Sequence, residues 1–241
     1  MYYKIGVDVG GTNTDAVLVS SKNVILAKTK QTTSTTISHG IENAIKNVIS
    51  EGNIPTEKIK YIMLGTTHCT NALVERKNLN KVGAIRIGLP ASRALPIMTD
   101  FPEDLKKILG KHNYLVDGGY EFDGRLISPL NEKEIKGYLL KMKGEVESLS
   151  ITGIFSKTLP NQELKVAEWA KNVLGTGIKI SCSHQVGGLG LLERENASIL
   201  NASLKGVATK MVTAFKETIK NTTHNNGLYV YLDLNEIKKK H

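Results

Sequence analysis

The chain has 241 residues, of which 40% are hydrophobic and 23% are charged, and it carries a formal net charge of +9. This length and composition are ordinary for a soluble globular protein with one large domain or two small ones. No apolar run reaches the roughly 18 residues that a membrane span needs, and two cysteines are too few for a disulfide framework. Because the first residues form a strand-like pattern without the apolar segment of a signal peptide, we expect a cytoplasmic protein with no membrane partner.

The positive charge is spread along the chain. Lysines stand beside glutamates in helix-like segments such as NEKEIKGYLLKMKGEVES, and aromatic residues make up only 5% of the chain. Proteins that bind single-stranded nucleic acids instead combine basic and aromatic residues along one groove. We therefore expect a solvated basic surface and no nucleic-acid partner, although such a surface attracts small phosphates.

The first 88 residues are predicted to form a β-β-β-α-β-α-β series. The first helix has apolar residues at helical spacing, is expected to be capped by Ser38 and stops at Gly52. A meander followed by helical crossovers implies antiparallel and then parallel pairing in a mixed sheet. The expected strands cover residues 4–9, 14–20, 23–29, 59–64 and 82–88, and the second helix covers about 70–77.

From about residue 89 to residue 180 the chain becomes rich in loops and is punctuated by prolines. A hairpin is expected around Asp123-Gly124. Helices at about 131–142 and 161–174 flank a predicted strand at 148–155. We interpret this stretch as an inserted α+β region.

After the glycine-rich segment QVGGLG, apolar residues recur at helical spacing and predict a long helix over about 191–221. The fold class expected from all these elements is α/β, with a mixed sheet flanked by helices at 1–88. The segment 1–88 and the inserted region at about 89–180 together belong to a first part of the chain, which covers residues 1–182. A second part, which contains the long helix, covers residues 183–241.

Residues 5–16 read IGVDVGGTNTDA and interrupt the first strand pattern with glycines and polar residues. A plain hairpin explains Gly10 and Gly11, since glycine permits a tight turn or a close backbone approach, but it does not explain Asp8 or the threonines. Amides released by a glycine turn form an anion-binding nest that hydroxyls extend, and a carboxylate can hold a hydrated Mg²⁺ that bridges to a phosphate. We therefore favour a loop for the phosphates of a magnesium–nucleotide complex. Its residues are Gly10, Gly11, Thr12, Asn13 and Thr14.

A second motif, GTTHCTNALVERK at residues 65–77, places hydroxyl groups at a strand end and a helix start. Such a helix start attracts an anion or a carbonyl group, and simple capping by Thr67 or Thr70 is an equal alternative. His68 and Cys69 are adjacent, so their side chains point in different directions and we do not expect a nucleophile–base pair.

The strand–D-x-G-G-T–strand unit resembles the first half of the actin-like ATPases, which include sugar kinases and actin and have a ribonuclease H-like fold. The second motif, GTT-x-x-TNALxERK, resembles the hydantoinase A/5-oxoprolinase family more specifically, and the resemblance runs from about residue 4 to residue 229. Further matching strings are DVGGTxTD at residues 8–15, DGGYEFDGRL at 117–126, ITGIFS at 151–156 with Glu163 after it, and SHQVGGLGLLERENASILNASL at 183–204.

This resemblance implies ATP-dependent opening of a small cyclic amide, such as a hydantoin or 5-oxoproline, or activation of a related carbonyl compound. ATP and Mg²⁺ are the implied cofactors. Because an unstrained cyclic amide is a poor electrophile, the implied chemistry is phosphorylation of its carbonyl oxygen followed by attack of water. The implied roles are catalysis and metal binding for Asp8, phosphate binding for the glycine loop, substrate or cleft contacts for Thr66, Thr67 and Asn71, and a catalytic, substrate-facing role for His184.

Several roles keep a simpler alternative. His184 can cap the turn after a strand. Residues 193–196, which read EREN, are as easily an ion-pair cluster at a helix start as a ligand site. Asp15 either holds the loop through a backbone hydrogen bond or lies near the metal, and we favour the hydrogen bond. Asn13 stands where the family usually has an aromatic or another residue, so the substrate stays open.

The actin-like fold also needs a second half with another phosphate loop and an adenosine pocket, and no such segment follows residue 229. We therefore expect the N-terminal portion of a longer or two-chain enzyme. A hydantoinase B-type subunit and self-association stay open as partners. The alternative functions are an actin-like sugar or metabolite kinase and a non-catalytic module of the same fold.

Overall fold

The structure is a computed structural model, and it describes residues 1–32, 37–223 and 229–234. The chain divides into two compact units. Unit 1 comprises residues 1–75 and those from 207 onward, and unit 2 comprises residues 76–206. In the described part of the chain, no helix is long and apolar enough to cross a membrane.

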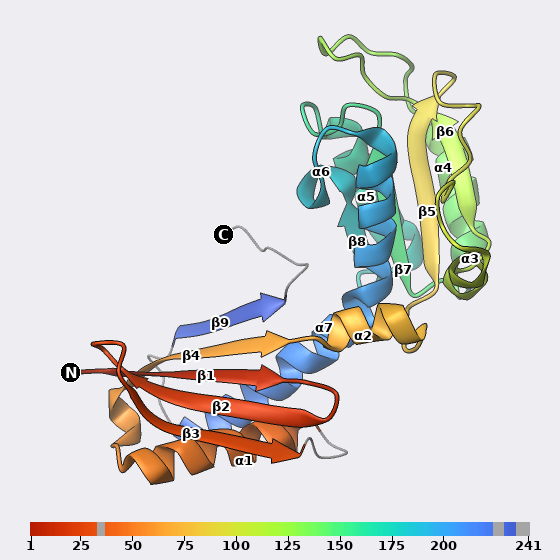
Figure 1. The fold of residues 1–241 in the computed structure, drawn as a ribbon. Coiled ribbons are helices and arrows are strands. Elements are labelled where there is room, and N and C mark those ends of the chain that lie inside the picture. Colours follow the sequence, from red (N-terminus) through yellow and green to blue (C-terminus); the bar gives the residue numbers. More distant parts are fainter. Residues whose placement is uncertain (33–36, 224–228, 235–241) are drawn as a thin grey trace. The chain divides into compact units, whose positions relative to one another are not determined.

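Unit 1 is built on a five-stranded mixed sheet with the strand order β3-β2-β1-β4-β9 (Figure 1). The first three strands form an antiparallel meander, whereas β4 runs parallel to β1 and β9 runs parallel to β4. The strands are β1 (Tyr3–Val9), β2 (Asn13–Ser20), β3 (Ile25–Thr32), β4 (Ile59–Thr66) and β9 (Tyr229–Leu234). The helices are α1 (Ile37–Gly52), the short 3-10 turn η1 (Thr56–Lys58), α2 (His68–Glu75) and the second half of α7 (Leu191–Thr223).

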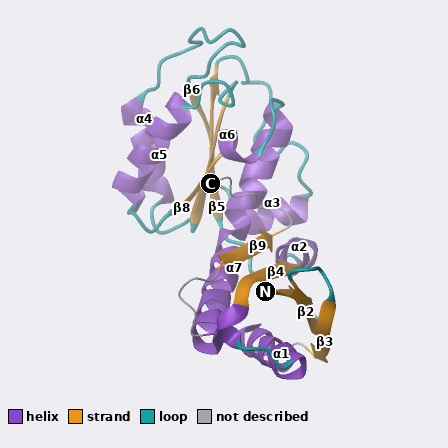
Figure 2. Ribbon diagram, turned by 90° about the vertical axis from the view of Figure 1, so that its left-hand side faces the viewer, coloured by secondary structure: helices purple, strands orange, loops and turns teal. Residues whose placement is uncertain are grey.

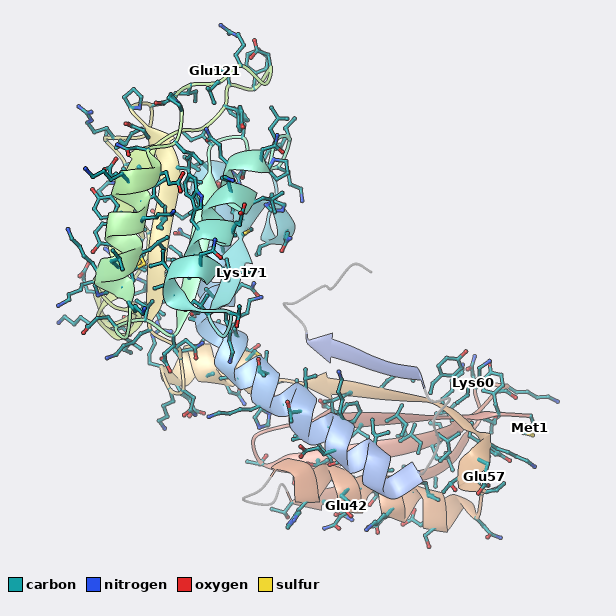
Figure 3. All side chains as sticks on the ribbon, turned by 180° about the vertical axis from the view of Figure 1, so that it is seen from behind. Met1, Glu42, Glu57, Lys60, Glu121 and Lys171 are labelled. Atoms are coloured by element: carbon teal, nitrogen blue, oxygen red, sulfur yellow. The ribbon has the colours of Figure 1, made fainter. Side chains whose placement is uncertain are left out.

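One face of this sheet carries the core of unit 1. Ile5, Val7 and Val9 alternate along β1 and pack in one apolar cluster with residues of α1 and α7, such as Ile45 and Phe215. Because side chains alternate between the faces of a strand, the residues between them lie on the other face. That second face carries Asp8 of the first motif, which is exposed. Figure 3 shows Glu42 on α1, where it pairs with Lys46 one helical turn later.

Unit 2 is built on a four-stranded parallel sheet with the order β6-β5-β7-β8. Figure 2 shows this sheet edge-on, with α4 and α5 on one side and α3 and α6 on the other. Its strands are β5 (Val82–Leu89), β6 (Asn113–Asp117), β7 (Ser148–Gly153) and β8 (Lys179–Cys182). Its helices are α3 (Glu103–Leu109), α4 (Glu132–Met142), α5 (Asn161–Leu174), α6 (Ser183–Val186) and the first half of α7.

Apolar clusters fill both faces of the parallel sheet. Helices α4 and α5 pack on one face, with Leu139 and Val166 against Ile85 and Ile151. Helix α3 and the start of α7 pack on the other face. All four strands end at the same edge, where Figure 3 places Glu121 in the loop after β6. In parallel α/β sheets this carboxyl edge is where ligands bind.

The structure corrects three sequence-based predictions. Strand β5 was expected in the first sheet, but it lies in the second one because almost all of it is buried, which suits a central parallel strand. The inserted region was expected to be α+β, yet its strands are all parallel with helical crossovers, so it is α/β. The first helix was expected to start after Ser38, but α1 begins one residue before it, at Ile37.

The helix ranges, the hairpin and the division of the chain can also be compared with the structure. Helices α4, α5 and α7 match their predicted ranges closely. The hairpin around Asp123-Gly124 is reduced to one antiparallel bridge between Tyr120 and Leu126. The chain passes between the two units at 75/76 and 206/207, and not at the expected boundary near residue 88. The family-level boundary at residue 182 stays a prediction.

Candidate functional site

The loop between β1 and β2 consists of Gly10, Gly11 and Thr12 and follows the carboxyl end of β1. The amide of Gly10 donates to the carbonyl of Asn13 at 2.9 Å and closes the turn. A β-carbon on Gly10 would lie 3.1 Å from that carbonyl oxygen, so glycine is needed here for a close approach. Within the described residues, the amides of Gly11 and Thr12 have no backbone partner, and both residues are exposed, as an anion-binding nest requires.

Two carboxylates lie opposite each other next to this loop. Asp8 on β1 pairs in register with Asp15 on β2 and with Gly65 on β4. Asp8 is exposed, and its carboxylate has no hydrogen bond or ion pair within the described residues. Asp15 instead pairs with Lys30, with 3.3 Å between Oδ2 and Nζ, which replaces the backbone hydrogen bond expected for it. Like charges directly opposite on neighbouring strands destabilise a sheet, so a cation bound near Asp8 would relieve this repulsion.

The donor atoms beside the loop fit magnesium. Exposed carboxylate and hydroxyl oxygens are the ligands that Mg²⁺ takes while it keeps several of its waters. Asp8 would hold the ion, and a bound Mg²⁺ would supply the positive charge that phosphates need there.

The second motif lies against the first. Thr66 ends β4, donates its hydroxyl to the carbonyl of Val9 at 3.1 Å and accepts the amide of His68 at 3.1 Å. It therefore joins the end of β1 to the start of α2. A β-carbon on Gly11 would lie 3.4 Å from Nδ2 of Asn71, so the Asn71 amide is a direct neighbour of the loop. Thr67, which lies between the end of β4 and the start of α2, is exposed.

Two predicted site residues face the core instead of the loop. Thr14 is fully buried, because it shares its side of β2 with Ala16 and Leu18. Thr66 is also buried, and its hydroxyl is used in the bonds just described. Both side chains are closed to a ligand. The exposed or half-buried residues here are Asp8, Gly10, Gly11, Thr12, Asn13, Thr67 and Asn71.

His184 lies in unit 2, in a buried polar cluster at the carboxyl ends of β7 and β8. Its ring Nδ1 is 2.5 Å from Oε2 of Glu163, which also accepts the amide of His184 at 3.1 Å. The other oxygen, Oε1, accepts the amide of Gly153 at 2.8 Å and the hydroxyl of Ser183 at 2.5 Å. Burial raises the pKa of Glu163, but hydrogen bonds from His184, Ser183 and Ser156 outweigh it and hold that pKa below its ordinary value.

Arg194, at the start of α7, closes this cluster from the other side. Its side chain is buried and donates to the hydroxyl of Ser183 at 2.9 Å, to the carbonyl of Gly153 at 2.6 Å and to that of Leu189 at 2.6 Å. Burial lowers the pKa of Arg194, and the nearby carboxylates oppose that shift. A β-carbon on Gly187 would lie within 3.0 Å of the Arg194 backbone, so the loop before α7 needs glycine at this position.

Glu163, Cys182 and His184 bring three donor atoms within 4.8 Å of one another. A metal is nevertheless a poor fit. Burial raises the pKa of the Cys182 thiol to about 12, and the charge of Glu163 adds to this shift. Both oxygens of Glu163 already accept hydrogen bonds, and Arg194 brings a positive charge to the same cluster. The chemistry of these groups suits a hydrogen-bonding network.

Sequence reasoning did not foresee that Glu163 and Arg194 meet His184 in one buried polar cluster. Glu163 and His184 are 21 positions apart, and helical or strand spacing carries no signal for such a pair. The sequence-based alternative for residues 193–196, an ion-pair cluster within one helix turn, is also wrong for two of them. Arg194 binds backbone carbonyls, and Glu195 pairs with Arg86 on β5.

The mixed sheet with its glycine loop, together with the parallel sheet flanked by helices, defines an α/β protein. Its family is shown by sequence. Residues 4–174 match the hydantoinase/oxoprolinase N-terminal region, and the chain belongs to this family.

Two solved structures have a similar fold. One is acetone carboxylase in a nucleotide-free structure, described as ATP-dependent, with a TM-score of 0.69 and 18% identity over 89% of this chain and 34% of that chain. Another is the ATP-dependent caprolactamase of Pseudomonas jessenii, with a TM-score of 0.69 and 20% identity over 95% of this chain and 35% of that chain. At these identities the likeness shows the fold alone.

A curated relative is an uncharacterized protein of Methanocaldococcus jannaschii. It is 28% identical over 245 residues, which cover 95% of this chain and 35% of the relative. The chain thus spans about a third of the length of the proteins that it resembles.

Proposed function

We propose that this chain supplies the phosphate-binding, N-terminal portion of an ATP-dependent enzyme that opens a small cyclic amide. The observation that carries the proposal is the exposed loop of Gly11 and Thr12, with the unpaired carboxylate of Asp8 on one side and Asn71 on the other. Membership of the hydantoinase/oxoprolinase family supports the amide substrate. The ATP dependence stated for two proteins of similar fold supports the nucleotide.

The proposed reaction has three balanced steps. The amide oxygen attacks the γ-phosphorus of ATP, the bond to the bridging oxygen breaks, and ADP leaves. Water then adds to the activated carbon, the C–N bond breaks, and the ring nitrogen takes a proton, which gives an acyl phosphate. A second water converts it to the carboxylic acid and inorganic phosphate. Phosphoryl transfer depends mainly on positioning and charge neutralisation. The loop amides would position the phosphates, a Mg²⁺ held by Asp8 would neutralise their charge, and His184 is proposed as a proton-accepting group.

The test follows the label of γ-labelled ATP in a complete enzyme that contains this chain, with hydantoins, 5-oxoproline and simple lactams as candidate substrates. The expected result is labelled inorganic phosphate in equal amount to ring-opened product. Label in a stable phosphorylated metabolite would instead identify a kinase. If none of these compounds gives either labelled phosphate or a phosphorylated metabolite, the result would favour a non-catalytic module.

Gly11→Val probes the loop itself. Gly11 is exposed and its backbone is not left-handed, so the variant should fold normally. Its branched side chain would fill the space next to Asn71, which lies 3.4 Å from the new β-carbon, and keep phosphates away from the backbone. Turnover should fall by more than about a hundredfold, about 3 kcal/mol, with an unchanged melting temperature. Gly177→Val, at an exposed loop glycine with nothing within 4 Å, is the matched control. Normal turnover in Gly11→Val would contradict the phosphate-loop assignment.

A further inference from the structure

The two ends of the His184 ring have different environments. Nδ1 is held by the fully buried carboxylate of Glu163 at 2.5 Å. Nε2 has no hydrogen-bond partner within the described residues, and the His184 side chain is 15% exposed to solvent. The ring therefore has one fixed nitrogen and one available nitrogen.

The carboxylate that fixes the ring is itself fixed. The amides of Gly153 and His184 and the hydroxyl of Ser183 all donate to Glu163, so its two oxygens cannot rotate away from the ring without losing these bonds. Arg194 holds Ser183 and the carbonyl of Gly153 in place. Lys157 donates to the carbonyl of His184 at 2.9 Å and so fixes its backbone. Of the charged and titratable groups around the ring, namely Glu163, Cys182, Lys157 and Arg194, only Glu163 bonds to a ring nitrogen.

We infer that Glu163 is a positioning residue that holds His184 in the tautomer with hydrogen on Nδ1, so that Nε2 faces outward as a proton acceptor. A carboxylate accepts only, and it therefore requires the donor form of Nδ1. A proton taken up at Nε2 gives an imidazolium whose Nδ1–H stays on the Glu163 carboxylate, and this contact neutralises the new charge. The groups that can donate to this nitrogen are a water molecule or the N–H of a small amide.

The tautomer can be measured in the 241-residue chain, with no need for turnover. In ¹⁵N-histidine-labelled protein at a pH where His184 is neutral, long-range proton–nitrogen spectra should show hydrogen on Nδ1 and none on Nε2. Glu163→Gln places an amide opposite the ring and should raise the population of the Nε2–H form. Glu168→Gln changes an exposed residue of the same helix and should leave the spectrum as it was. A wild-type ring with hydrogen on Nε2, or a Glu163→Gln spectrum identical to wild type, would overturn the inference.

The proton-accepting role rests on the proposed function and needs a complete, active enzyme that contains this chain. His184→Ala should lose at least about a hundredfold in turnover, and added imidazole should restore part of it, because a free base can replace a missing one. A loss that imidazole does not restore would limit His184 to a structural role. If the wild-type enzyme opens no cyclic amide, the proposed function fails, while the tautomer measurement still decides the role of Glu163.

Discussion

Asp8 occupies a position where a carboxylate has little structural use. It is exposed, it has no partner within the described residues, and it lies opposite a second acid on β2. A purely structural aspartate would tie down the glycine turn, yet that turn is closed by the backbone bond between Gly10 and Asn13. The structure therefore leaves the charge of Asp8 free for a ligand.

Asp8→Asn should separate charge from structure. We expect an unchanged or slightly raised melting temperature, since removing one of two facing charges relieves repulsion. Turnover of the complete enzyme should fall by about a hundredfold or more, about 3 kcal/mol, because an amide cannot supply the charge that holds Mg²⁺. Thermal melting and steady-state rates at several Mg²⁺ concentrations check both points, and extra Mg²⁺ should restore only part of the rate. A destabilised variant with near-normal turnover would assign Asp8 to the scaffold.

At the scale of elements, a buried ion pair joins β5 to α7. Arg86 is fully buried, its guanidinium lies 2.5 Å from Glu195, and it also donates to the carbonyls of Leu95 and Pro96. Such a pair is costly to bury, and removing one partner leaves an uncompensated charge in the interior. This pair fixes the loop after β5 and the start of α7 to the same strand.

Arg86→Met should lower the free energy of unfolding by about 3–5 kcal/mol, because Glu195 stays buried without its partner. The double variant Arg86→Met, Glu195→Leu should recover most of that loss, since both charges are gone. Lys106→Met, which breaks an exposed pair with Glu103, should cause no measurable change. Urea unfolding of the wild type and the three variants is the measurement. A double variant as unstable as Arg86→Met alone would show that the loop carbonyls, and not the charge pair, set the cost.

At the scale of the whole molecule, the buried network around Glu163 makes stability depend on pH. The pKa of Glu163 is lower in the folded chain than its ordinary value of 4.5. The folded state therefore binds this proton less readily than the unfolded state. Its contribution to stability is complete above pH 4.5 and is lost as the pH falls through the folded pKa.

Below pH 4.5, wild-type chain should therefore lose stability more steeply as the pH falls than Glu163→Gln, which has no carboxyl to protonate. Urea unfolding at several pH values measures both slopes. The exposed Glu168→Gln variant is the matched control and should follow the wild-type slope. Equal slopes in wild type and Glu163→Gln would mean that other groups govern the acid sensitivity of the chain.

Local patterns in the sequence determined much of this protein. Apolar periodicity placed α4, α5 and α7 within a few residues, and the string DVGGTNTD located a strand–loop–strand unit with its exposed acid. The inward position of Thr14 also had a signal, because period-two alternation puts it on the face of Ala16 and Leu18. We nevertheless predicted that Thr14 binds phosphate, because a threonine hydroxyl next to a glycine loop is typical of a phosphate site.

Only the tertiary structure decided which strands share a sheet and which side chains meet. A short apolar run such as β5 fits either sheet, and the helices packed on both of its faces select the parallel one. The contact of Gly11 with Asn71 and the bond of Glu163 to His184 join elements far apart in sequence, at the carboxyl ends of parallel strands. Spacing along the chain encodes neighbours on one helix or strand, and it carries no information on partners that crossover connections bring together.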